Sequence, residues 1–362
     1  MMASALDPNK NLEGPTLSLA TGEPRLADIA EIAGVSMSTV SRVLNGKATV
    51  ASSTRRAVLT ALDSLGYDRY RMAGARATGL VGIILPELIN PVFAAMAQVA
   101  GTFLTRGGYT PIVCTLTPTG PTEDEYIEAL IKADVDGILF CYGMHADTTA
   151  AHDRYQRLGS LGLPIVLVGG HAPDVDVPQV AVDDATAMSL AVRHLASQGH
   201  RRIGLAVGSE RFSPSQNKRI GFVEALVDAG LATSLDDAET HVVPSAFAIE
   251  GGQIAASELI TAGHTAIVCG SDVLAIGAIR AARLRRLRVP EDVSVVGYDD
   301  SPLMSYTAPP LTTVRQPVRP LCQAAVQALL DEMRGLNPSR ELLLIEPELV
   351  VRSTTAIAPS AD

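Results

Sequence analysis

The amino-acid sequence predicts a small all-helical head followed by a large α/β body built on parallel sheets. Two short helical stripes of apolar residues, separated at Gly34, predict the head. Continuous β-branched runs that alternate with helical patterns predict the body, because strands covered on both faces are apolar throughout. The length of 362 residues suits two or three domains.

The head begins with the stretch from Leu26 to Asn45, which reads LADIAEIAGVSMSTVSRVLN. Gly34 permits the positive φ of a tight turn, and Ser36 can cap the helix that follows. Two helices joined in this way form a helix-turn-helix, whose second helix enters the DNA major groove. A third helical pattern from Ser52 to Leu65 favours this interpretation over a hairpin that only packs.

The charge of the chain is unevenly distributed. Residues 25–76 hold eight basic and four acidic side chains, so this segment is +4, and the remainder of a chain with net charge −10 is −14. A basic head on an acidic body directs one end of the molecule toward phosphate.

Several classes of protein are disfavoured by what the sequence lacks. The four cysteines lie far apart without a Cys-x-x-Cys pair, which indicates buried thiols rather than disulfides or zinc. No apolar run reaches the ~18 residues of a membrane span, and the N-terminus lacks a signal-like segment, so we expect a cytoplasmic protein. Nucleotide-binding, nucleophile-elbow and metal motifs are absent, which predicts no enzyme, no cofactor and no metal.

The body shows seven apolar runs that we predict to be strands, interleaved with helical patterns. The runs are LVGIILP, TPIVC, GILFC, PIVLV, RIGLAV, AIVC and SVVG, and the helices fall near 92–106, 122–133, 151–161, 185–198, 215–229, 251–262 and 273–288. Alternation on this scale predicts right-handed βαβ units, and so many units predict two lobes.

Polar and aromatic residues follow the predicted strands, where ligands bind in open parallel sheets. Carboxylates, an arginine, hydroxyls and aromatic rings at these positions suit a polyhydroxylated ligand. Each has a plainer alternative, since Asp272 could cap a helix, Asp299 and Asp300 could form a turn, and His145 and Arg219 could be solvated. The residues are Asn90, Phe93, Tyr142, His145, Arg219, Ser271, Asp272, Asp299 and Asp300.

Two segments of the head, ADIAEIAGVSMSTVSRVLNG and STRRAVLTALDSLGY, resemble the DNA-binding head of the lactose-repressor family of bacterial transcription regulators. The resemblance continues through INPVFAAMAQ, AVRHLASQGHRRIGL, IVCGSDVLAIGAI, VPEDVSVVGYDDSP and PPLTTVRQP, and it spans roughly residues 24 to 353. Part of the body resembles the actinobacterial branch that answers to cellobiose or related oligosaccharides.

The resemblance implies a homodimer that binds pseudo-palindromic operator DNA, and a body with the two-lobed fold of type I periplasmic sugar-binding proteins. It implies base contacts from Met37, Ser38 and Arg42, beside the exposed Ser41. It implies phosphate contacts from Ser36, Thr39, Asn45, Thr54 and Tyr67, to which we add Leu26 and Ser52. Matching effector-pocket positions are Phe93, Arg219, Phe247, Ser271, Asp272, Asp299 and Gln316, while His145 stands where some relatives have an acidic contact.

The segment after the head departs from the family. Relatives have a hinge helix that inserts a leucine into the minor groove, whereas the run here is RMAGARATG, without leucine. We hypothesise that Arg71 or Arg76 enters the minor groove, with Met72 as the rival wedge.

We therefore predict a tail at 1–23, a DNA-binding domain at 24–70, a hinge at 71–79, a body at 80–355 and a tail at 356–362. Within the body, the first lobe takes about 80–182 and 314–337, and the second about 183–313 and 338–353. The predicted function is an effector-controlled transcriptional repressor. A cytoplasmic solute-binding protein without a DNA role, and a corepressor-dependent regulator, are the alternatives.

Overall fold

A computed structural model describes residues 26–44, 50–64, 79–117 and 119–359. The chain divides into two compact units, Met1–Ala75 and Arg76–Asp362. In the described part of the chain, no helix is long and apolar enough to cross a membrane.

The head is a three-helix unit, as the sequence predicts. Its helices are α1 (Leu26–Ala33), α2 (Met37–Leu44) and α3 (Ser52–Ser64). Gly34 has φ +64°, and the Val35 N–H donates to the Ala30 carbonyl, so the chain reverses sharply after α1. The apolar faces of the three helices share one small core, formed by Ile29, Ala30, Val40, Val43, Val58 and Ala61.

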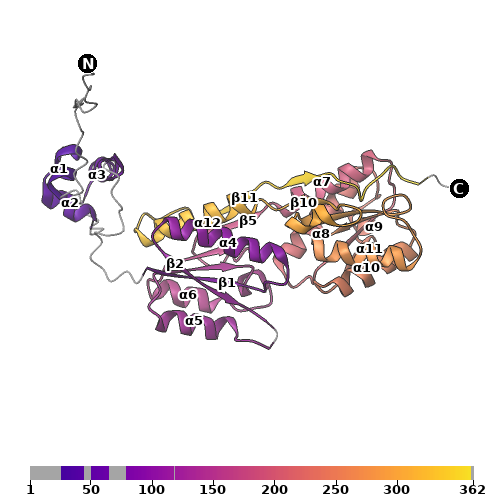
Figure 1. The fold of residues 1–362 in the computed structure, drawn as a ribbon, viewed down its shortest axis with the longest axis horizontal. Helices are drawn as coiled ribbons and strands as arrows, with labels where there is room; N and C mark the ends of the chain where they lie inside the picture. The colour runs from indigo at the N-terminus through magenta and orange to yellow at the C-terminus, as the bar shows by residue number, and fades with distance from the viewer. Residues whose placement is uncertain (1–25, 45–49, 65–78, 118, 360–362) are drawn as a thin grey trace, which may run out of the picture. The chain divides into compact units, whose positions relative to one another are not determined.

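The first lobe of the body is a six-stranded parallel sheet in the order β11-β5-β4-β3-β1-β2. Helices α4 and α12 cover one face of the sheet, and α5 and α6 cover the other (Figure 1). The strands are β1 (Leu80–Leu85), β2 (Thr110–Thr115), β3 (Gly137–Cys141), β4 (Ile165–Val168), β5 (Gln179–Val182) and β11 (Leu342–Ile345). The helices are α4 (Pro91–Arg106), α5 (Glu123–Lys132), α6 (Asp153–Ser160) and α12 (Val318–Met333), with the short η2 (Met144–Ala146).

The second lobe is a six-stranded sheet in the order β12-β10-β9-β8-β6-β7, in which β12 pairs antiparallel with β10 and the other pairs are parallel. Its strands are β6 (Ile203–Val207), β7 (Val242–Pro244), β8 (Ala266–Cys269), β9 (Ser294–Asp299), β10 (Thr312–Arg315) and β12 (Glu348–Val350). Its helices are α7 (Asp184–Ser197), α8 (Ser213–Asp228), α9 (Leu235–Glu239), α10 (Ile249–Thr261), α11 (Asp272–Leu284) and the short η3 (Pro302–Tyr306).

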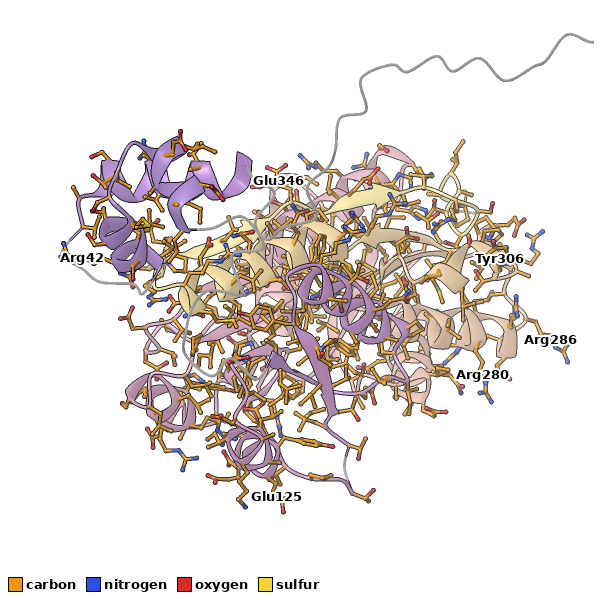
Figure 2. The ribbon with its side chains drawn as sticks, turned by 60° about the vertical axis from the view of Figure 1, so that its left-hand side comes forward. Arg42, Glu125, Arg280, Arg286, Tyr306 and Glu346 are labelled. Carbon is orange, nitrogen blue, oxygen red and sulfur yellow. The ribbon has the colours of Figure 1, made fainter. Side chains whose placement is uncertain are left out.

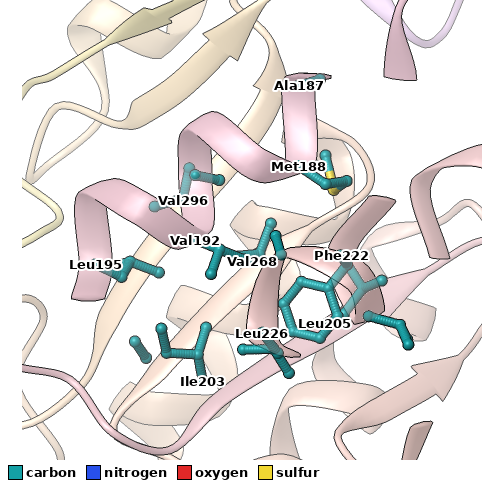
Figure 3. Packing of buried hydrophobic residues seen from close by; sticks show 14 of the residues in the cluster. Ala187, Met188, Val192, Leu195, Ile203, Leu205, Phe222, Leu226, Val268 and Val296 are labelled. Atoms are coloured by element: carbon teal, nitrogen blue, oxygen red, sulfur yellow. The ribbon is translucent and has the colours of Figure 1, made fainter. Parts of the chain in front are cut away.

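Apolar packing on both faces of each sheet explains why the strands are continuous apolar runs. In the second lobe, Val192, Leu195 and Phe222 of α7 and α8 pack on Leu205 and Val268 of the strands (Figure 3). Helices α10 and α11 form a separate core on the opposite face of the sheet. All four cysteines are buried and free, as their spacing predicts.

The chain passes between the lobes three times, after β5, β10 and β11. The third crossing differs from the predicted boundary near residue 338, because Leu342–Ile345 pairs with β5 and belongs to the first sheet. The predicted tail at 356–362 also begins as ordered chain, since the N–H groups of Ala356 and Ala358 donate to Ser294 and Gln198 of the second lobe.

Candidate functional site

Helix α2 presents a polar face to solvent on the side opposite its buried residues. Val40 and Val43 are buried in the head core, whereas Met37 is 57% exposed and Ser38 and Arg42 are exposed. Arg42 projects outward from the head (Figure 2). The residues predicted to contact base edges therefore lie together on the outer surface of the second helix.

The other predicted DNA contacts surround this face or lie outside the described residues. Ser36 Oγ accepts a hydrogen bond from the Thr39 N–H at 3.2 Å, which caps α2 as predicted. Thr39, Ser41 and Thr54 are half-buried, and Leu26 packs against the head core. The side chain of Ser52 and the whole of Asn45, Tyr67, Arg71 and Arg76 lie outside the described residues, as does the hinge up to residue 78.

A cavity of about 190 Å³ lies between the two lobes of the body. Its walls come from the carboxyl ends of β1, β3, β8 and β9 and from the beginnings of α4, α8 and α11. Residues named from the sequence that line it are Asn90, Phe93, Tyr142, Phe247, Ser271, Asp299 and Gln316, and unpredicted ones include Phe212, Ser215, Lys218 and Tyr298. Glu87, which follows the first strand, lines it as well.

A hydrogen-bonded chain joins the lobes at this cavity. The Tyr142 hydroxyl donates to Gln316 Oε1 at 3.0 Å, and Gln316 Nε2 donates to Asp299 Oδ1 at 2.6 Å. The Phe93 ring meets the Tyr142 ring edge-on, with centroids 5.5 Å apart. Three residues predicted from distant parts of the sequence, Phe93, Asp299 and Gln316, are thus brought together.

Glycine is required where two of the aromatic rings approach the backbone. A Cβ on Gly208 would collide with the ring of Phe247, and a Cβ on Gly169 would collide with that of Tyr142. Gly169 also has φ +77°, a conformation that other residues rarely adopt. The strand ends of both lobes therefore leave room for aromatic rings beside the cavity.

Lys218, and not the predicted Arg219, lies in the cavity wall. Its ammonium lies 2.7 Å from Asp184 Oδ1 and 4.0 Å from the centroid of the Tyr298 ring, and the Tyr298 hydroxyl donates to the same carboxylate oxygen. Successive residues of a helix are rotated by about 100°, so Arg219 points elsewhere and pairs with Glu239 at 2.8 Å. The stripe of Ser215, Lys218 and Phe222 at spacings of three and four was the signal that could have identified Lys218.

Asp272 is fully buried behind the cavity wall and does not line it. Its carboxylate accepts hydrogen bonds from the Ser301 N–H at 2.8 Å and from the Thr313 hydroxyl at 2.6 Å. These contacts hold the turn in which Asp299 and Asp300 have φ of +123° and +55°. Burial raises the pKa of Asp272 to about 6. Burial and the nearby Asp272 carboxylate also raise the pKa of Asp299, whose Oδ2 has no hydrogen-bond partner among the described residues.

His145 also lies outside the cavity, against the prediction of an effector contact. It is 1% exposed, and its Nε2–H faces the Val168 carbonyl at 3.2 Å. Its own N–H donates to the Tyr155 hydroxyl, which in turn donates to Glu123. Burial lowers the pKa of the imidazole to about 3, so His145 is a neutral part of the first-lobe core near the cavity wall.

Two charged contacts flank the cavity. On one side, Arg211 of the second lobe pairs with the buried Asp147 of the first at 2.8 Å, and the Thr148 N–H donates to the Arg211 carbonyl. Within the second lobe, Asp300 accepts hydrogen bonds from Arg315 at 2.7 Å and from Arg352 at 2.6 Å, and Arg315 also contacts Glu348 at 2.9 Å. The Arg211–Asp147 pair therefore links the lobes in addition to the three crossings of the chain, whereas the Asp300 contacts join strand ends of the second lobe.

A helix-turn-helix head followed by a two-lobed body with an interlobe cavity defines a DNA-binding regulator with a ligand-binding domain. Residues 25–69 match the bacterial regulatory proteins of the lacI family, and residues 192–355 match the periplasmic binding protein-like domain. The chain is 55% identical to the HTH-type transcriptional regulator MalR of Streptomyces coelicolor, over 92% of this chain and 97% of that protein.

Solved structures resemble the whole chain as well. A transcriptional regulator CelR–cellobiose complex is 31% identical, with a TM-score of 0.67 over 91% of this chain and 99% of that one. The lac repressor dimer bound to operator and an anti-inducer is 26% identical, with a TM-score of 0.67 over 92% and 100%. The chain belongs to the lacI family of bacterial transcriptional regulators, a non-enzymatic family.

We predict that His145 makes the body sensitive to acid. The unfolded imidazole has a pKa of about 6.5, and the folded one a pKa of about 3. Between these values only the unfolded chain takes up the proton, so the free energy of unfolding falls by up to about 1.4 kcal/mol per pH unit as pH decreases. Denaturant titrations at several pH values should show a shallower acid limb for His145→Gln. His171→Gln, at an exposed histidine, should keep the wild-type slope. An unchanged slope for His145→Gln would contradict this assignment.

Proposed function

We propose that this regulator is a cytoplasmic repressor that binds a pseudo-palindromic operator as a homodimer and releases it when a sugar enters the interlobe cavity. One observation supports this most directly. The same chain has an exposed Met37–Ser38–Arg42 face on its second helix and a polar, aromatic cavity in its body. A solute-binding protein without a DNA role would have no use for the first feature.

The lining of the cavity favours a sugar as the effector. Phe93, Tyr142, Phe212 and Phe247 supply apolar rings, and Asn90, Ser215, Asp299 and Gln316 supply polar atoms beside them. A sugar ring has apolar C–H faces and a rim of hydroxyls, so it matches a site of this mixed kind. The solved CelR–cellobiose complex shows that a related structure binds a disaccharide.

The proposed mechanism is a shift between two arrangements of the lobes. A ligand that contacts Phe93 and Asn90 on one lobe and Asp299 on the other favours the closed arrangement. Closure alters the three crossings and, through the dimer, the spacing of the two heads. The effector changes operator affinity only by its differential affinity for the two arrangements, typically about 1–3 kcal/mol.

The surface of α11 and η3 is the face that we propose for the homodimer. Leu284, Leu303 and Tyr306 are exposed by 66%, 62% and 85%, and Arg280 lies beside them on α11. Arg280 and Tyr306 project from the same end of the second lobe (Figure 2). The Arg283 guanidinium of α11 donates to the Ala308 carbonyl just after η3, so the end of α11 and η3 lie together, and exposed apolar side chains gathered on one surface mark contact sites.

The proposed DNA contacts predict that two arginines of the head affect operator affinity differently. Arg42→Ala should reduce affinity for the specific operator by about 10- to 100-fold, because a bidentate arginine–guanine contact supplies ~1–3 kcal/mol of discrimination. Arg56→Ala removes the same charge from exposed α3, and should weaken specific and non-specific binding alike. Fluorescence anisotropy with operator and scrambled duplexes measures both ratios. Equal loss on both duplexes for Arg42→Ala would contradict base contact.

The proposed sugar effector leads to the prediction that an allosteric sugar acts through Asp299. A sugar that stabilises the wild-type protein should lower its operator affinity by about 5- to 150-fold. Asp299→Asn should bind operator normally and lose this response, whereas Arg219→Gln, outside the cavity, should respond as wild type. Operator titrations with and without sugar decide the matter. A sugar that increases operator affinity would instead establish corepression.

If the surface of α11 and η3 forms the homodimer, a charged side chain introduced there should produce a monomer. Tyr306→Asp should shift the wild-type dimer toward monomer in analytical ultracentrifugation, because a carboxylate would be buried without a partner. Leu161→Asp, at a 63% exposed leucine at the end of α6, is the control and should leave the mass unchanged. A dimeric Tyr306→Asp would place the interface elsewhere.

A further inference from the structure

Three helices begin at the cavity, which would ordinarily favour an anionic ligand. The first turns of α4, α8 and α11 contribute Val92, Ser215 and Val273 to its lining. Free N–H groups and the helix dipole make such positions attractive to phosphate. Whether the cavity can bind an anion therefore depends on how many of these N–H donors are present and unpaired.

The donors at all three helix beginnings are reduced by local sequence. Pro91 begins α4 and Pro214 lies in the first turn of α8, and neither has an N–H. The Asn90 side chain accepts from the Val92 N–H at 3.3 Å, and Ser271 Oγ accepts from the Leu274 N–H at 3.2 Å. The buried carboxylate of Asp272 stands at the first position of α11, where it opposes a second negative charge.

The charged groups at the cavity also oppose an anion. Among the lining residues, all of which are described, Lys218 is the only cation, and it is already paired with Asp184 at 2.7 Å. Glu87 and Asp299 line the cavity, and Asp272 lies directly behind it. A phosphate would have to displace Asp184 from Lys218 and then remain close to several carboxyl groups.

Two buried polar atoms of the lining residues have no hydrogen-bond partner in the described part of the chain, and they suit hydroxyl groups. Ser215 and Asp299 are 2% and 4% exposed, and Ser215 Oγ and Asp299 Oδ2 make no hydrogen bond to any described residue. Buried polar atoms are normally satisfied, so two unpartnered atoms on residues that line the cavity indicate a partner that binds there. A serine hydroxyl and a carboxyl group both form neutral hydrogen bonds with an alcohol.

We propose that the cavity takes an uncharged polyhydroxylated ligand and rejects its phosphorylated form, and that Ser215 is a specificity-determining contact. This inference rests on the proposed sugar effector and specifies its chemical class. Uncharged ligand hydroxyls satisfy Ser215 and Asp299 without breaking the Lys218–Asp184 pair. A phosphorylated sugar carries a negative charge, and the three helix beginnings stabilise it poorly because several of their N–H donors are missing or already paired.

A paired ligand screen tests the class of effector. The full-length protein is heated with glucose, ribose, maltose, cellobiose or trehalose, and with the phosphorylated counterpart of each, at matched ionic strength. We expect stabilisation by one or more uncharged sugars and, by calorimetry, at least about 100-fold weaker binding of the counterpart, because a phosphate charge would be desolvated without a partner. A phosphorylated member that binds as tightly as its uncharged form, or more tightly, overturns the inference while leaving the sugar effector intact.

Failure of the proposed function has a different signature. If no member of any pair stabilises the protein, the sugar effector itself is wrong and this inference falls with it. Operator binding by the head is measured separately and is unaffected by that outcome.

A pair of serine variants tests the contact. Ser215→Ala should weaken binding of the sugar found in the screen by about 3- to 10-fold, the usual effect of one hydrogen bond. Ser209→Ala should leave the affinity within twofold, because Ser209 is exposed and lies outside the lining. Equal affinities for wild type and Ser215→Ala, with both variants folded, would remove Ser215 from the ligand contacts.

Discussion

Parallel pairing of the strands is the constraint on which the rest of the body depends. Parallel strands of one sheet all end at the same edge, so residues far apart in the sequence meet there. Each lobe has such an edge, and three crossings of the chain set the two edges against each other. The cavity exists between them for this reason, and it gathers residues from Pro86 to Gln316.

The contacts around the cavity differ in how much free energy is lost when each of them is broken. The Asp184–Lys218 pair and the bonds to Asp272 are buried within the second lobe, and removing one partner of a buried ion pair costs about 3–5 kcal/mol. The Arg211–Asp147 contact spans the lobes, and the arginine is 52% exposed. When it breaks, water solvates the exposed arginine, and the buried Asp147 carboxylate keeps its hydrogen bonds from the Thr149 N–H and hydroxyl, so this contact is exchanged more easily than the fully buried pair. The contacts within the second lobe are therefore the costlier ones to break, and we expect rearrangement mainly in the contacts between the lobes.

Much of this architecture could be predicted from periodicity and short motifs. The apolar runs and helical stripes predict the head, the main strands and the two lobes. The short strands β5, β7, β10, β11 and β12 were not predicted, because three or four residues give no resolvable period and these segments are not continuous apolar runs with a clear boundary. Strand β11 shows the consequence, since Leu342–Ile345 joins the sheet of the other lobe.

The direction of side chains was harder to predict than their proximity. Phe93, Asp299 and Gln316 converge as expected because strand ends determine where they lie. Arg219 lies one helical step from the cavity-facing Lys218, and only tertiary packing decides which of the two faces inward. His145 and Asp272 follow strands too, but both side chains turn into the protein. There the His145 Nε2–H faces the Val168 carbonyl, and Asp272 accepts from the Ser301 N–H and the Thr313 hydroxyl.

The Asp299–Asp300 turn has a mechanical consequence. Positive φ at both residues lets neighbouring carboxylates face apart, with Asp299 at the cavity and Asp300 on Arg315 and Arg352. Arg315 ends the strand that leads into the second crossing. A ligand that pulls on Asp299 thus acts one peptide unit, about 3.8 Å, from the anchor of a segment joining the lobes. A displacement of Asp299 can therefore reach this crossing through a single peptide bond, without a long series of side-chain contacts.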